Sequence, residues 1–294
     1  MNKKSIVTIG TFDGVHKGHR LLIGKTVSLA GKSKLKSIVI SLEKPVKKVK
    51  GLLTTCDEKL EEIKALGVDE IILINVPSEI LTYTADKFFD EFLLNELNIS
   101  EIVCGSDFAF GKDRKGDTGW LKKKAKNNNV KVSIVKYLKN SSKQISSSYI
   151  RTLLEKGDLK NAAKLLGRPY SFSGIPFKDK GFGKKLGFPT VNLKVNSDKL
   201  IPKGVYISII TQKDKVYPSV TSIGSRLTFN RGGKIVPETH ILNFDGIWKK
   251  TLTKVILLKK IRDEKKFKNV QALKVQISKD IAKSSKFFKF GKTV

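Results

Sequence analysis

The sequence contains little cysteine, little histidine and no long apolar run. Its two cysteines, Cys56 and Cys104, are far apart and do not have metal-ligand spacing with the three histidines. We therefore expect neither a redox pair nor a cysteine-based metal site. No run approaches the roughly 20 apolar residues that cross a bilayer, and the start of the chain lacks the longer apolar core of a secretory signal. These absences predict a cytoplasmic protein that does not act in a membrane.

Acidic residues are also scarce. The chain has 58 lysines and arginines against 27 aspartates and glutamates, a formal charge of +31. A charge of this size attracts anions such as nucleotides, and it raises the hypothesis of an RNA-binding protein. The lysines are spread over almost every segment, however, and the sequence has no arginine-rich arm, aromatic ladder or nucleic-acid motif. We therefore expect small molecules rather than nucleic acid as partners, while the oligomeric state stays open.

A chain of 294 residues with a hydrophobic fraction of 39% is long enough for one or two globular domains. In its first half, short apolar runs alternate with segments of helical spacing. The expected strands cover 6–9, 36–42, 68–76, 99–104 and 130–135, and the expected helices cover 18–30, 54–66, 83–97 and 120–125. Such alternation predicts an α/β, Rossmann-like domain whose parallel sheet is covered by helices on both faces. Ligands of such sheets bind beyond the carboxyl ends of the strands.

The segment 8–20, TIGTFDGVHKGHR, reads as a strand, a tight turn and the start of a helix. It contains His16 and His19, two of the three histidines, with Gly18 between them. A helix start offers unpaired N–H groups and the positive end of its dipole, and two imidazoles beside a glycine can add hydrogen bonds to a phosphate. The alternatives are an exposed loop with chance histidines and a partial metal site. The strand-turn-helix context favours a phosphate site.

Three later loops are expected at the same edge of this sheet, and the first of them follows the second strand. The segment 105–117 follows the fourth strand, and the segment 145–151, ISSSYIR, follows the fifth. In the last of these loops Ser147 and Ser148 can cap a helix, and Arg151 carries a guanidinium suited to a triphosphate. The alternative is an ordinary helix cap.

The second half of the chain has a different character. Two short helical patterns over 152–168 break at Gly157-Asp158, and short alternating runs separated by turns follow. This pattern predicts a second domain built as an antiparallel meander or small β-barrel, with a last helix over 265–282. We expect the domains to cover 1–165 and 166–294.

A glycine- and lysine-rich loop with Gly181, Gly183 and Lys184 leads into Thr190 and Asn192. Residues two apart in a strand point to the same face, so the Thr190 hydroxyl and the Asn192 amide can act together on one Mg²⁺–phosphate group. The spacing is not that of a P-loop. A flexible turn entering a strand is the alternative.

The segment 10–19, GTFDGVHKGH, resembles the signature of the H-x-G-H nucleotidyltransferases, and specifically that of the bacterial bifunctional riboflavin kinase/FAD synthetases. The loops at 105–117 and 145–151 resemble that family's flavin and nucleotide loop and its I-S-S-T-x-x-R motif. The resemblance implies an adenylylation site in which His16, His19 and Arg151 hold the triphosphate of ATP. The other ATP- and flavin-binding residues that it implies here are Gly10, Phe12, Gly18, Asp107, Phe110, Gly111, Ser147 and Ser148.

One departure from that family concerns the segment after the second strand. The family carries a P-H-P-like segment there, whereas this chain has Leu42-Glu43-Lys44-Pro45 and lacks the histidine. The resemblance therefore leaves open a riboflavin kinase with weak or absent FAD synthesis.

The second half resembles riboflavin kinase domains over several segments that occur in the family's order. They are LGRPY at 166–170, GFPTVN at 187–192, GVY at 204–206, IGSR at 223–226 and ETH at 238–240. The second of them is the family's P-T-A-N motif with Val191 in place of alanine. Further departures are Leu227, Asn243 and Trp248, and none of these positions has an expected chemical role.

The resemblance implies two consecutive reactions. The barrel binds riboflavin and MgATP, Glu238 acts as the base, and FMN and ADP form. The first domain then joins FMN to the AMP part of a second ATP, which gives FAD and pyrophosphate. For Glu238 the alternative is a strand-edge salt bridge, and His240 is expected to be structural. Another H-x-G-H nucleotidyltransferase would leave the second domain unexplained, and a non-enzymatic RNA-binding protein would leave both phosphate sites unexplained.

Overall fold

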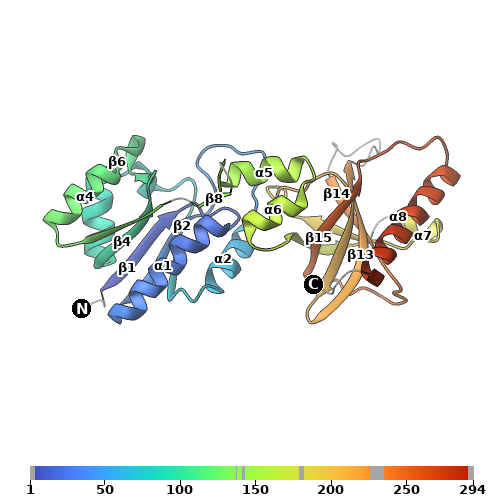
Figure 1. The fold of residues 1–294 in the computed structure, drawn as a ribbon, viewed down its shortest axis with the longest axis horizontal. Coiled ribbons are helices and arrows are strands. Elements are labelled where there is room, and N and C mark those ends of the chain that lie inside the picture. Colours follow the sequence, from blue (N-terminus) through green and yellow to red (C-terminus); the bar gives the residue numbers. More distant parts are fainter. Residues whose placement is uncertain (1–3, 137, 141–142, 179–181, 226–234, 291–294) are drawn as a thin grey trace. The chain divides into compact units, whose positions relative to one another are not determined.

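The computed structural model describes residues 4–136, 138–140, 143–178, 182–225 and 235–290. The chain divides into two compact units, Met1–Ser147 and Ser148–Val294, and each is described by itself (Figure 1). Among the described residues, no helix combines the length and the apolar character that a bilayer crossing needs.

The first unit contains the expected parallel sheet. Its five strands lie in the order β3-β2-β1-β4-β7, and every pairing between them is parallel. They cover Ser5–Gly10 (β1), Lys36–Leu42 (β2), Glu70–Ile74 (β3), Ile99–Gly105 (β4) and Lys131–Val135 (β7). The strand order reverses beside β1, which is where open α/β sheets bind their ligands. The segments after β1, β2 and β4 therefore all start at the candidate binding edge.

Helices cover both faces of this sheet, as expected (Figure 1). The main ones are α1 (Lys17–Ser33), α2 (Cys56–Lys64) and α4 (Thr118–Asn127). On one face Ile23 and Ile63 pack with Val39, and on the other face a larger cluster packs around Val7 and includes Phe89. Burial of these apolar side chains from two sides fixes the sheet as the centre of the unit.

The segment 83–97, expected to be one α-helix, has a more varied structure. A 3-10 turn, η1 (Glu79–Thr82), precedes it, α3 (Ala85–Lys87) is short, and η2 (Phe88–Glu96) is a π-helix. The apolar spacing correctly indicates which side chains of this segment are buried. It does not distinguish a π-helix from an α-helix, because the two differ in hydrogen bonding rather than in which face is apolar.

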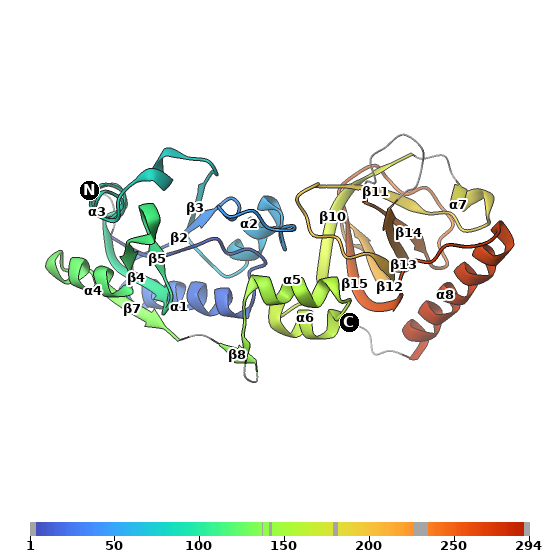
Figure 2. The same cartoon turned by 90° about the horizontal axis from the view of Figure 1, so that it is seen from above.

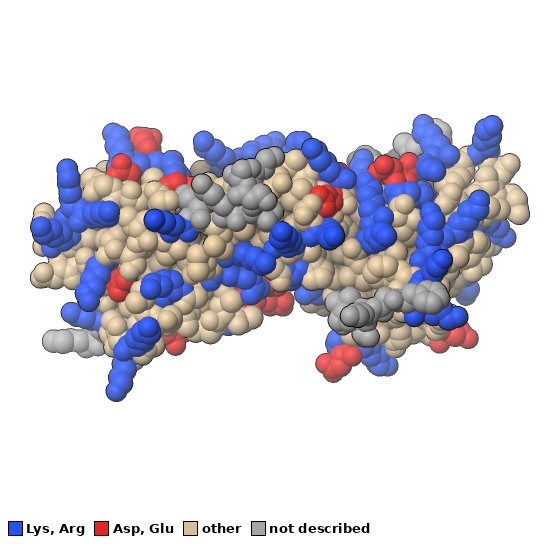
Figure 3. All heavy atoms as spheres, viewed as in Figure 1, with Lys and Arg blue, Asp and Glu red and all other residues tan. Residues whose placement is uncertain are grey.

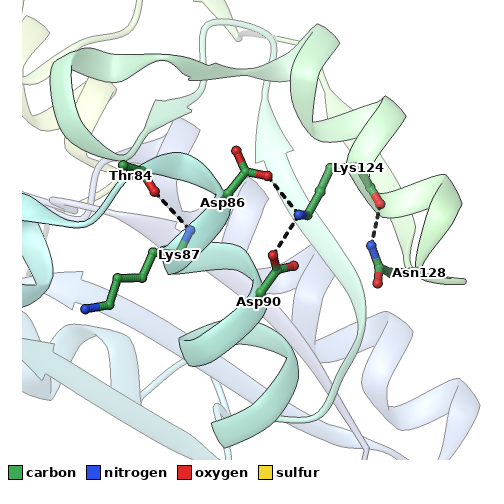
Figure 4. Close-up of polar contacts among 6 residues, drawn as sticks. All are labelled: Thr84, Asp86, Lys87, Asp90, Lys124 and Asn128. Carbon is green, nitrogen blue, oxygen red and sulfur yellow. Dashed lines mark hydrogen bonds and ion pairs between the residues drawn. The ribbon is translucent and has the colours of Figure 1, made fainter.

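Lys124 of α4 is tied to this segment by two carboxylates (Figure 4). Its ammonium nitrogen lies 2.8 Å from Asp86 Oδ1 and 2.7 Å from Asp90 Oδ2, and these hydrogen bonds raise the pKa of Lys124. Thr84 caps α3 by accepting a hydrogen bond from the N–H of Lys87 at 3.1 Å. Polar contacts thus fasten α3 and η2 to α4 at their exposed side.

Several small elements of the first unit are too short for sequence periodicity to reveal. They are β5 (Ala109–Phe110), η3 (Lys112–Arg114), β6 (Gly116–Asp117), β8 (Lys139–Asn140) and β9 (Lys143–Gln144).

The second unit contains the expected antiparallel barrel. Its strands close in the order β10-β11-β14-β13-β12-β15. They cover Tyr170–Phe177 (β10), Val191–Val195 (β11), Gly204–Gln212 (β12), Lys215–Ser225 (β13), Ile235–Ile241 (β14) and Thr253–Arg262 (β15). The helices α5 (Ser147–Glu155) and α6 (Leu159–Leu166) come before the barrel, and α7 (Phe182–Lys185) lies between β10 and β11.

The last helix, α8 (Val270–Phe290), runs along the outside of the barrel (Figure 2). It starts and ends later than the expected 265–282. The start is set by Asn269, whose Oδ1 accepts a hydrogen bond from the N–H of Ala272 at 2.8 Å. Its Ile281 and Phe288 pack with Val220 of β13, whereas Val270, expected on the packed face, is 52% exposed at the start of the helix.

A buried ion pair joins α8 to β15. Arg262 donates from Nε and Nη2 to Asp280 Oδ2 at 2.9 and 2.8 Å. Gln276 donates to the other carboxylate oxygen at 2.9 Å, and Asp280 is 2% exposed. Because each oxygen of this carboxylate has a donor, the charge is buried without an unsatisfied acceptor.

Hydroxyl groups lie on the inner side of the barrel wall. The Oγ of Ser208 is 2.8 Å from Ser219 Oγ and 2.7 Å from Thr221 Oγ1, which is 2.9 Å from Thr239 Oγ1. All four side chains are fully buried. Each is satisfied by its neighbours, as buried polar groups need to be.

Candidate functional site

The turn between β1 and α1 has an unusual backbone. Phe12 and Val15 have φ angles of +48° and +39°, a region that side chains other than glycine rarely adopt and that is especially unfavourable for a β-branched residue. The carbonyl of Phe12 accepts a hydrogen bond from the Val15 N–H at 3.0 Å. Strain of this kind persists only where the surroundings impose it, and it concentrates at functional sites.

Asp13 is the residue through which the surroundings hold this turn. Its Oδ1 accepts hydrogen bonds from the N–H groups of Leu53 at 2.9 Å and Thr54 at 3.1 Å. Gly14 donates its N–H to the Thr54 hydroxyl at 3.0 Å. The segment just before α2 therefore fixes the turn just before α1.

His16 and His19 come together at the start of α1. Their rings are stacked, with centroids 3.6 Å apart and 18° between the planes. His16 caps the helix, because its Nδ1 accepts the N–H of His19 at 3.3 Å.

His19 is electrostatically unusual. Loss of solvent around the ring, followed by repulsion from His16 and Lys59, holds the pKa of His19 well below its usual value of 6.5. Within the described part of the chain, its Nδ1 is buried and has no hydrogen-bond partner. The ring is therefore neutral at pH 7, and an anion beside it would raise its pKa again.

The other expected residues of this motif pack against the histidines. A side chain at Gly18 would come within 3.2 Å of the His16 ring, and one at Gly10 would come within 3.0 Å of the Phe12 ring. Phe12 is 1% exposed and meets the His19 ring edge-on at 5.3 Å. Gly18 and Phe12 thus contact the two imidazoles, and Gly10 contacts Phe12.

The loop at 145–151 begins beside the turn between β1 and α1. Ser147, the first residue of α5, donates its hydroxyl to the Asp13 carbonyl at 2.8 Å. Ser148 and Arg151 fall in the second unit, where Ser148 is exposed and Arg151 is 8% exposed. Of the expected serines, Ser147 is therefore the one that contacts the turn.

The expected site residues in the loop after β4 differ in solvent exposure. Asp107 is exposed, whereas Phe110 is 8% exposed and packs on Phe88 and Trp120, with ring centroids 5.4 and 5.5 Å away. Gly111 has a φ of +71°, and a side chain there would lie 2.7 Å from the backbone of Ala85. Packing alone therefore accounts for a phenylalanine at 110 and a glycine at 111.

Phe108 is the aromatic residue of this loop that keeps an accessible face. It is half-buried and stacks on Phe110, with centroids 5.4 Å apart. The sequence offered two phenylalanines two residues apart, and only the packing of the unit decides which one is covered.

Lys59 of α2 is a residue of this region that the motifs did not indicate. It is 1% exposed, and its ammonium group donates to the carbonyls of Thr11 at 3.1 Å, Glu43 at 3.0 Å and Leu42. Those carbonyls belong to the segments that follow β1 and β2. A lysine four residues before the buried Ile63, on the apolar face of α2, was the available signal in the sequence.

In the barrel, the register of β11 and β14 brings Asn192 directly opposite Glu238. Side chains of directly opposed residues share one face of the sheet. Asn192 is 7% exposed and Glu238 is half-buried. His240 Nδ1 is 2.9 Å from the carbonyl oxygen of Pro189, which holds the chain just before Thr190 against β14 and supports the structural role expected for His240.

The glycine-rich loop folds back over Thr190. The Gly183 carbonyl accepts the N–H of Phe188 at 2.8 Å, and a side chain at Gly183 would lie 2.6 Å from the Phe188 carbonyl and 3.1 Å from Thr190 Oγ1. Lys184 is exposed, and Gly181 lies outside the described residues. Gly183 therefore lets the backbone approach the Thr190 hydroxyl.

Surface charge agrees with anionic ligands. On the face shown in Figure 3, lysine and arginine side chains are spread widely and acidic side chains are few. In the part of the chain that the structure covers, no cluster of three or more histidine, cysteine, aspartate or glutamate residues has the arrangement of a metal site. The oxygens of Thr190 and Asn192 remain the candidate ligands for a metal bound together with phosphate.

These features define a class of protein in which a Rossmann-like unit with a histidine pair at a helix start is joined to a β-barrel with a carboxylate opposite an amide. The family described as FAD synthetase matches residues 1–149, and the family described as riboflavin kinase matches residues 166–288. A protein named bifunctional riboflavin kinase/FMN adenylyltransferase from Buchnera aphidicola subsp. Schizaphis graminum is 34% identical, with 98% of this chain and 95% of that protein covered. This chain belongs to the family of bifunctional riboflavin kinase/FMN adenylyltransferases.

Two further comparisons also span the whole chain. The protein of the same name from Bacillus subtilis is 31% identical, with 97% of this chain and 93% of that protein covered. A solved structure described as a macrolide-efflux protein from Streptococcus pneumoniae has a TM-score of 0.86 and 29% identity, with coverages of 97% and 95%. Its fold agrees with that of this chain, although its name differs from those of the sequence relatives.

Proposed function

We propose that this chain phosphorylates riboflavin to FMN in its barrel and joins FMN to AMP in its Rossmann-like unit, with ATP as the donor in both reactions. The observation that carries the proposal is that each unit holds its own arrangement for a phosphate group: the stacked His16 and His19 in one, and Asn192 opposite Glu238 in the other. The names of full-length relatives support it.

We place the domain boundary between residues 165 and 166. This boundary assigns residues 150–165, which neither family model matches, to the first domain.

In the kinase reaction the terminal ribityl hydroxyl of riboflavin attacks the γ-phosphorus of ATP. The bond from that phosphorus to the β–γ bridging oxygen breaks, ADP leaves, and Glu238 takes the hydroxyl proton. Asn192, opposite Glu238, is close enough to act on the same groups. A half-buried carboxylate on this face suits the role because it can be desolvated by the substrate while remaining reachable.

The residues around Thr190 fit a magnesium ion bound with ATP. The hydroxyl of Thr190 and the amide oxygen of Asn192 are hard oxygen donors, which Mg²⁺ prefers, and Mg²⁺ commonly keeps phosphate oxygens among its ligands. The close approach of the Gly183 backbone to Thr190 Oγ1 leaves a cradle that a side chain would fill. Bound Mg²⁺ would offset the negative charge that phosphoryl transfer concentrates.

In the adenylyl transfer a phosphate oxygen of FMN attacks the α-phosphorus of ATP. The bond from that phosphorus to the α–β bridging oxygen breaks, and pyrophosphate leaves. The nucleophile is already an anion, so the site needs positioning and charge stabilisation rather than a strong base. We assign this work to His16, to His19 and to the start of α1, with Arg151 as a further ligand of the triphosphate.

The other expected residues have supporting roles in this proposal. Ser147 holds the turn through Asp13, and Ser148 is proposed as a further donor to the phosphates. Asp107 lies exposed in the loop after β4, where Phe108 rather than Phe110 offers an accessible ring face. Use of ATP in both reactions favours the cytoplasm as the place of action.

The test is to incubate the purified full chain with riboflavin, ATP and Mg²⁺ and to separate the flavins over time. FMN that appears first and FAD that follows would support both activities. FMN alone would favour the kinase with absent FAD synthesis. Without any flavin product, ATP turnover with other acceptors would favour another H-x-G-H nucleotidyltransferase, and salt-sensitive RNA retention without ATP turnover would favour an RNA-binding protein.

A further inference from the structure

The ammonium group of Lys59 is buried where an apolar side chain would pack at lower cost. Removal of a charged amine from water is unfavourable unless hydrogen bonds compensate for it. Lys59 has three donors, and three carbonyl oxygens accept them, those of Thr11, Leu42 and Glu43. Retention of a fully satisfied cation at a 1% exposed position points to a role beyond filling space.

The carbonyls that Lys59 joins belong to two separate segments of the candidate edge. Thr11 comes directly before the turn with the positive φ angles at Phe12 and Val15. Leu42 ends β2, and Glu43 starts the segment in which Lys44 stands where the resembled family has a histidine. One side chain therefore sets the distance between the segments that follow β1 and β2.

The segment just before the helix that carries Lys59 also contacts the turn. The N–H groups of Leu53 and Thr54, just before α2, bind the Asp13 carboxylate. The start of α2 is itself fixed, since the Thr55 hydroxyl accepts the Glu58 N–H at 3.3 Å and Glu58 Oε2 accepts the Thr55 N–H at 3.0 Å. Lys59 lies one turn further along this fixed helix. Its hydrogen bond to the Thr11 carbonyl therefore fixes the position of Thr11.

We propose that Lys59 is a positioning residue for adenylyl transfer: its buried ammonium group locks the segments after β1 and β2 together, so that His16 and His19 meet the triphosphate in one fixed arrangement. The proposal rests on the function proposed above. In that reaction catalysis depends mainly on placement, and a displacement of about 1 Å can cost about 100-fold in rate.

The charge of Lys59 gives an independent signature of this placement. Repulsion from Lys59 is one of the causes that lower the pKa of His19, and burial lowers the pKa of Lys59 itself. Removal of the ammonium group should therefore raise the pKa of His19. A side chain that only filled space would leave that titration unchanged when it is replaced by another of similar size.

The experiment compares Lys59→Met, which keeps the length of the side chain, with Lys64→Met as the matched control. Lys64 is exposed at the end of the same helix. FAD formation from FMN and ATP is measured in the full chain, with riboflavin phosphorylation as an internal reference. We expect Lys59→Met to lower kcat of adenylyl transfer by about 10- to 100-fold with a smaller change in KM for ATP, and to leave kinase turnover unchanged.

Two further readouts separate positioning from mere structural support. The chain has three histidines, so His19 can be followed by NMR, and we expect its pKa to rise in Lys59→Met but not in Lys64→Met. In Lys59→Ala, added propylamine should restore part of the adenylyl transfer, whereas 1-propanol should not. Full adenylyl transfer in folded Lys59→Met would overturn the proposal. A loss with unaltered His19 titration and no amine rescue would overturn it as well.

A failure of the proposed function would look different. If the unaltered chain forms no FAD, the adenylyl-transfer assignment fails in every variant alike. The placement of the turn by Lys59 is then decided by the His19 titrations, which need no turnover. An unchanged His19 pKa in Lys59→Met would refute it, and a raised pKa would support it.

Discussion

Asn192 and Glu238 lie directly opposite each other on the antiparallel strands β11 and β14. This register places the amide of one and the carboxylate of the other on the same face of the barrel wall. Pro189, just before Thr190, is held against β14 by His240. A candidate metal ligand and a candidate base thus come from two strands whose pairing fixes their separation.

Glu238→Gln tests the carboxylate as the base of the kinase reaction. We expect riboflavin phosphorylation to fall by about 10²- to 10⁴-fold, the usual contribution of a general base, because the amide cannot accept the hydroxyl proton. FMN supplied to the variant should still be converted to FAD. Flavin chromatography with each substrate measures both steps, and unchanged kinase turnover would remove Glu238 from this role.

His16 caps α1 and has a proposed ligand role, and two variants separate the two. His16→Ala should lose FAD formation by about 10²-fold or more, the size of effect seen for one preorganised donor, and should also lose about 1 kcal/mol of stability with the cap. His16→Asn keeps a capping side chain, so its stability should be retained while FAD formation is still lost. Urea unfolding and FAD assays are the measurements. Normal FAD formation in either variant would contradict the ligand role.

The low pKa of His19 predicts an acid-sensitive contribution to stability. Above about pH 6.5 the ring is neutral in both the folded and the unfolded chain. As the pH falls below 6.5, the unfolded chain binds the proton before the folded chain does, so acid favours unfolding. Urea unfolding between pH 7.5 and pH 5 should show a smaller loss of stability for His19→Gln than for the unaltered chain. An equal loss would show that His19 does not titrate differently in the folded state.

Binding of ATP should reverse the shift at His19. A triphosphate beside the ring favours the protonated form, and the pKa should therefore rise on binding. Calorimetric titration near pH 6.5 in buffers of different ionisation enthalpy should show proton uptake, which should disappear in His19→Gln. Binding without proton exchange would place the triphosphate away from His19.

The buried pair Arg262–Asp280 should matter more to stability than its exposed neighbour Lys260–Asp263. Asp280→Ala leaves the guanidinium of Arg262, whose side chain is 14% exposed, without its partner, and such changes cost about 3–5 kcal/mol. Asp263, with 84% of its side chain exposed, serves as the control, and Asp263→Ala should leave stability unchanged. Denaturant unfolding of both variants is the measurement. Equal effects would mean that α8 is not anchored through Asp280.

Much of the architecture follows from the sequence because it depends on local apolar patterns. The strand expected at 36–42 is β2 as observed, since a fully buried parallel strand is apolar along its whole length. The alternating runs of the second half likewise indicate a barrel, although the register that opposes Asn192 to Glu238 is a long-range property. The π-helix of η2 was missed, because its hydrogen bonding leaves the apolar face unchanged.

The sequence predicts those parts of the candidate site whose residues are close together in the chain. It predicts less well the contacts between segments that are far apart in the chain. His16 and His19 lie within one turn of helix, so their proximity follows from spacing alone. The burial of Phe110 beneath Phe108 depends on Phe88 and Trp120, which come from other elements. Lys59 reaches carbonyls 16 to 48 residues away, and no local pattern reports such contacts.

The inner row of hydroxyls has a consequence for the strand that carries Glu238. In the series Ser219, Ser208, Thr221, Thr239, each hydroxyl lies within hydrogen-bond distance of the next, so one network joins β12, β13 and β14. Thr239, at the end of the series, adjoins Glu238 and points to the opposite side of β14. The strand is thus braced from within by hydroxyl hydrogen bonds, and a valine at position 221 would separate Thr239 from the rest of the series.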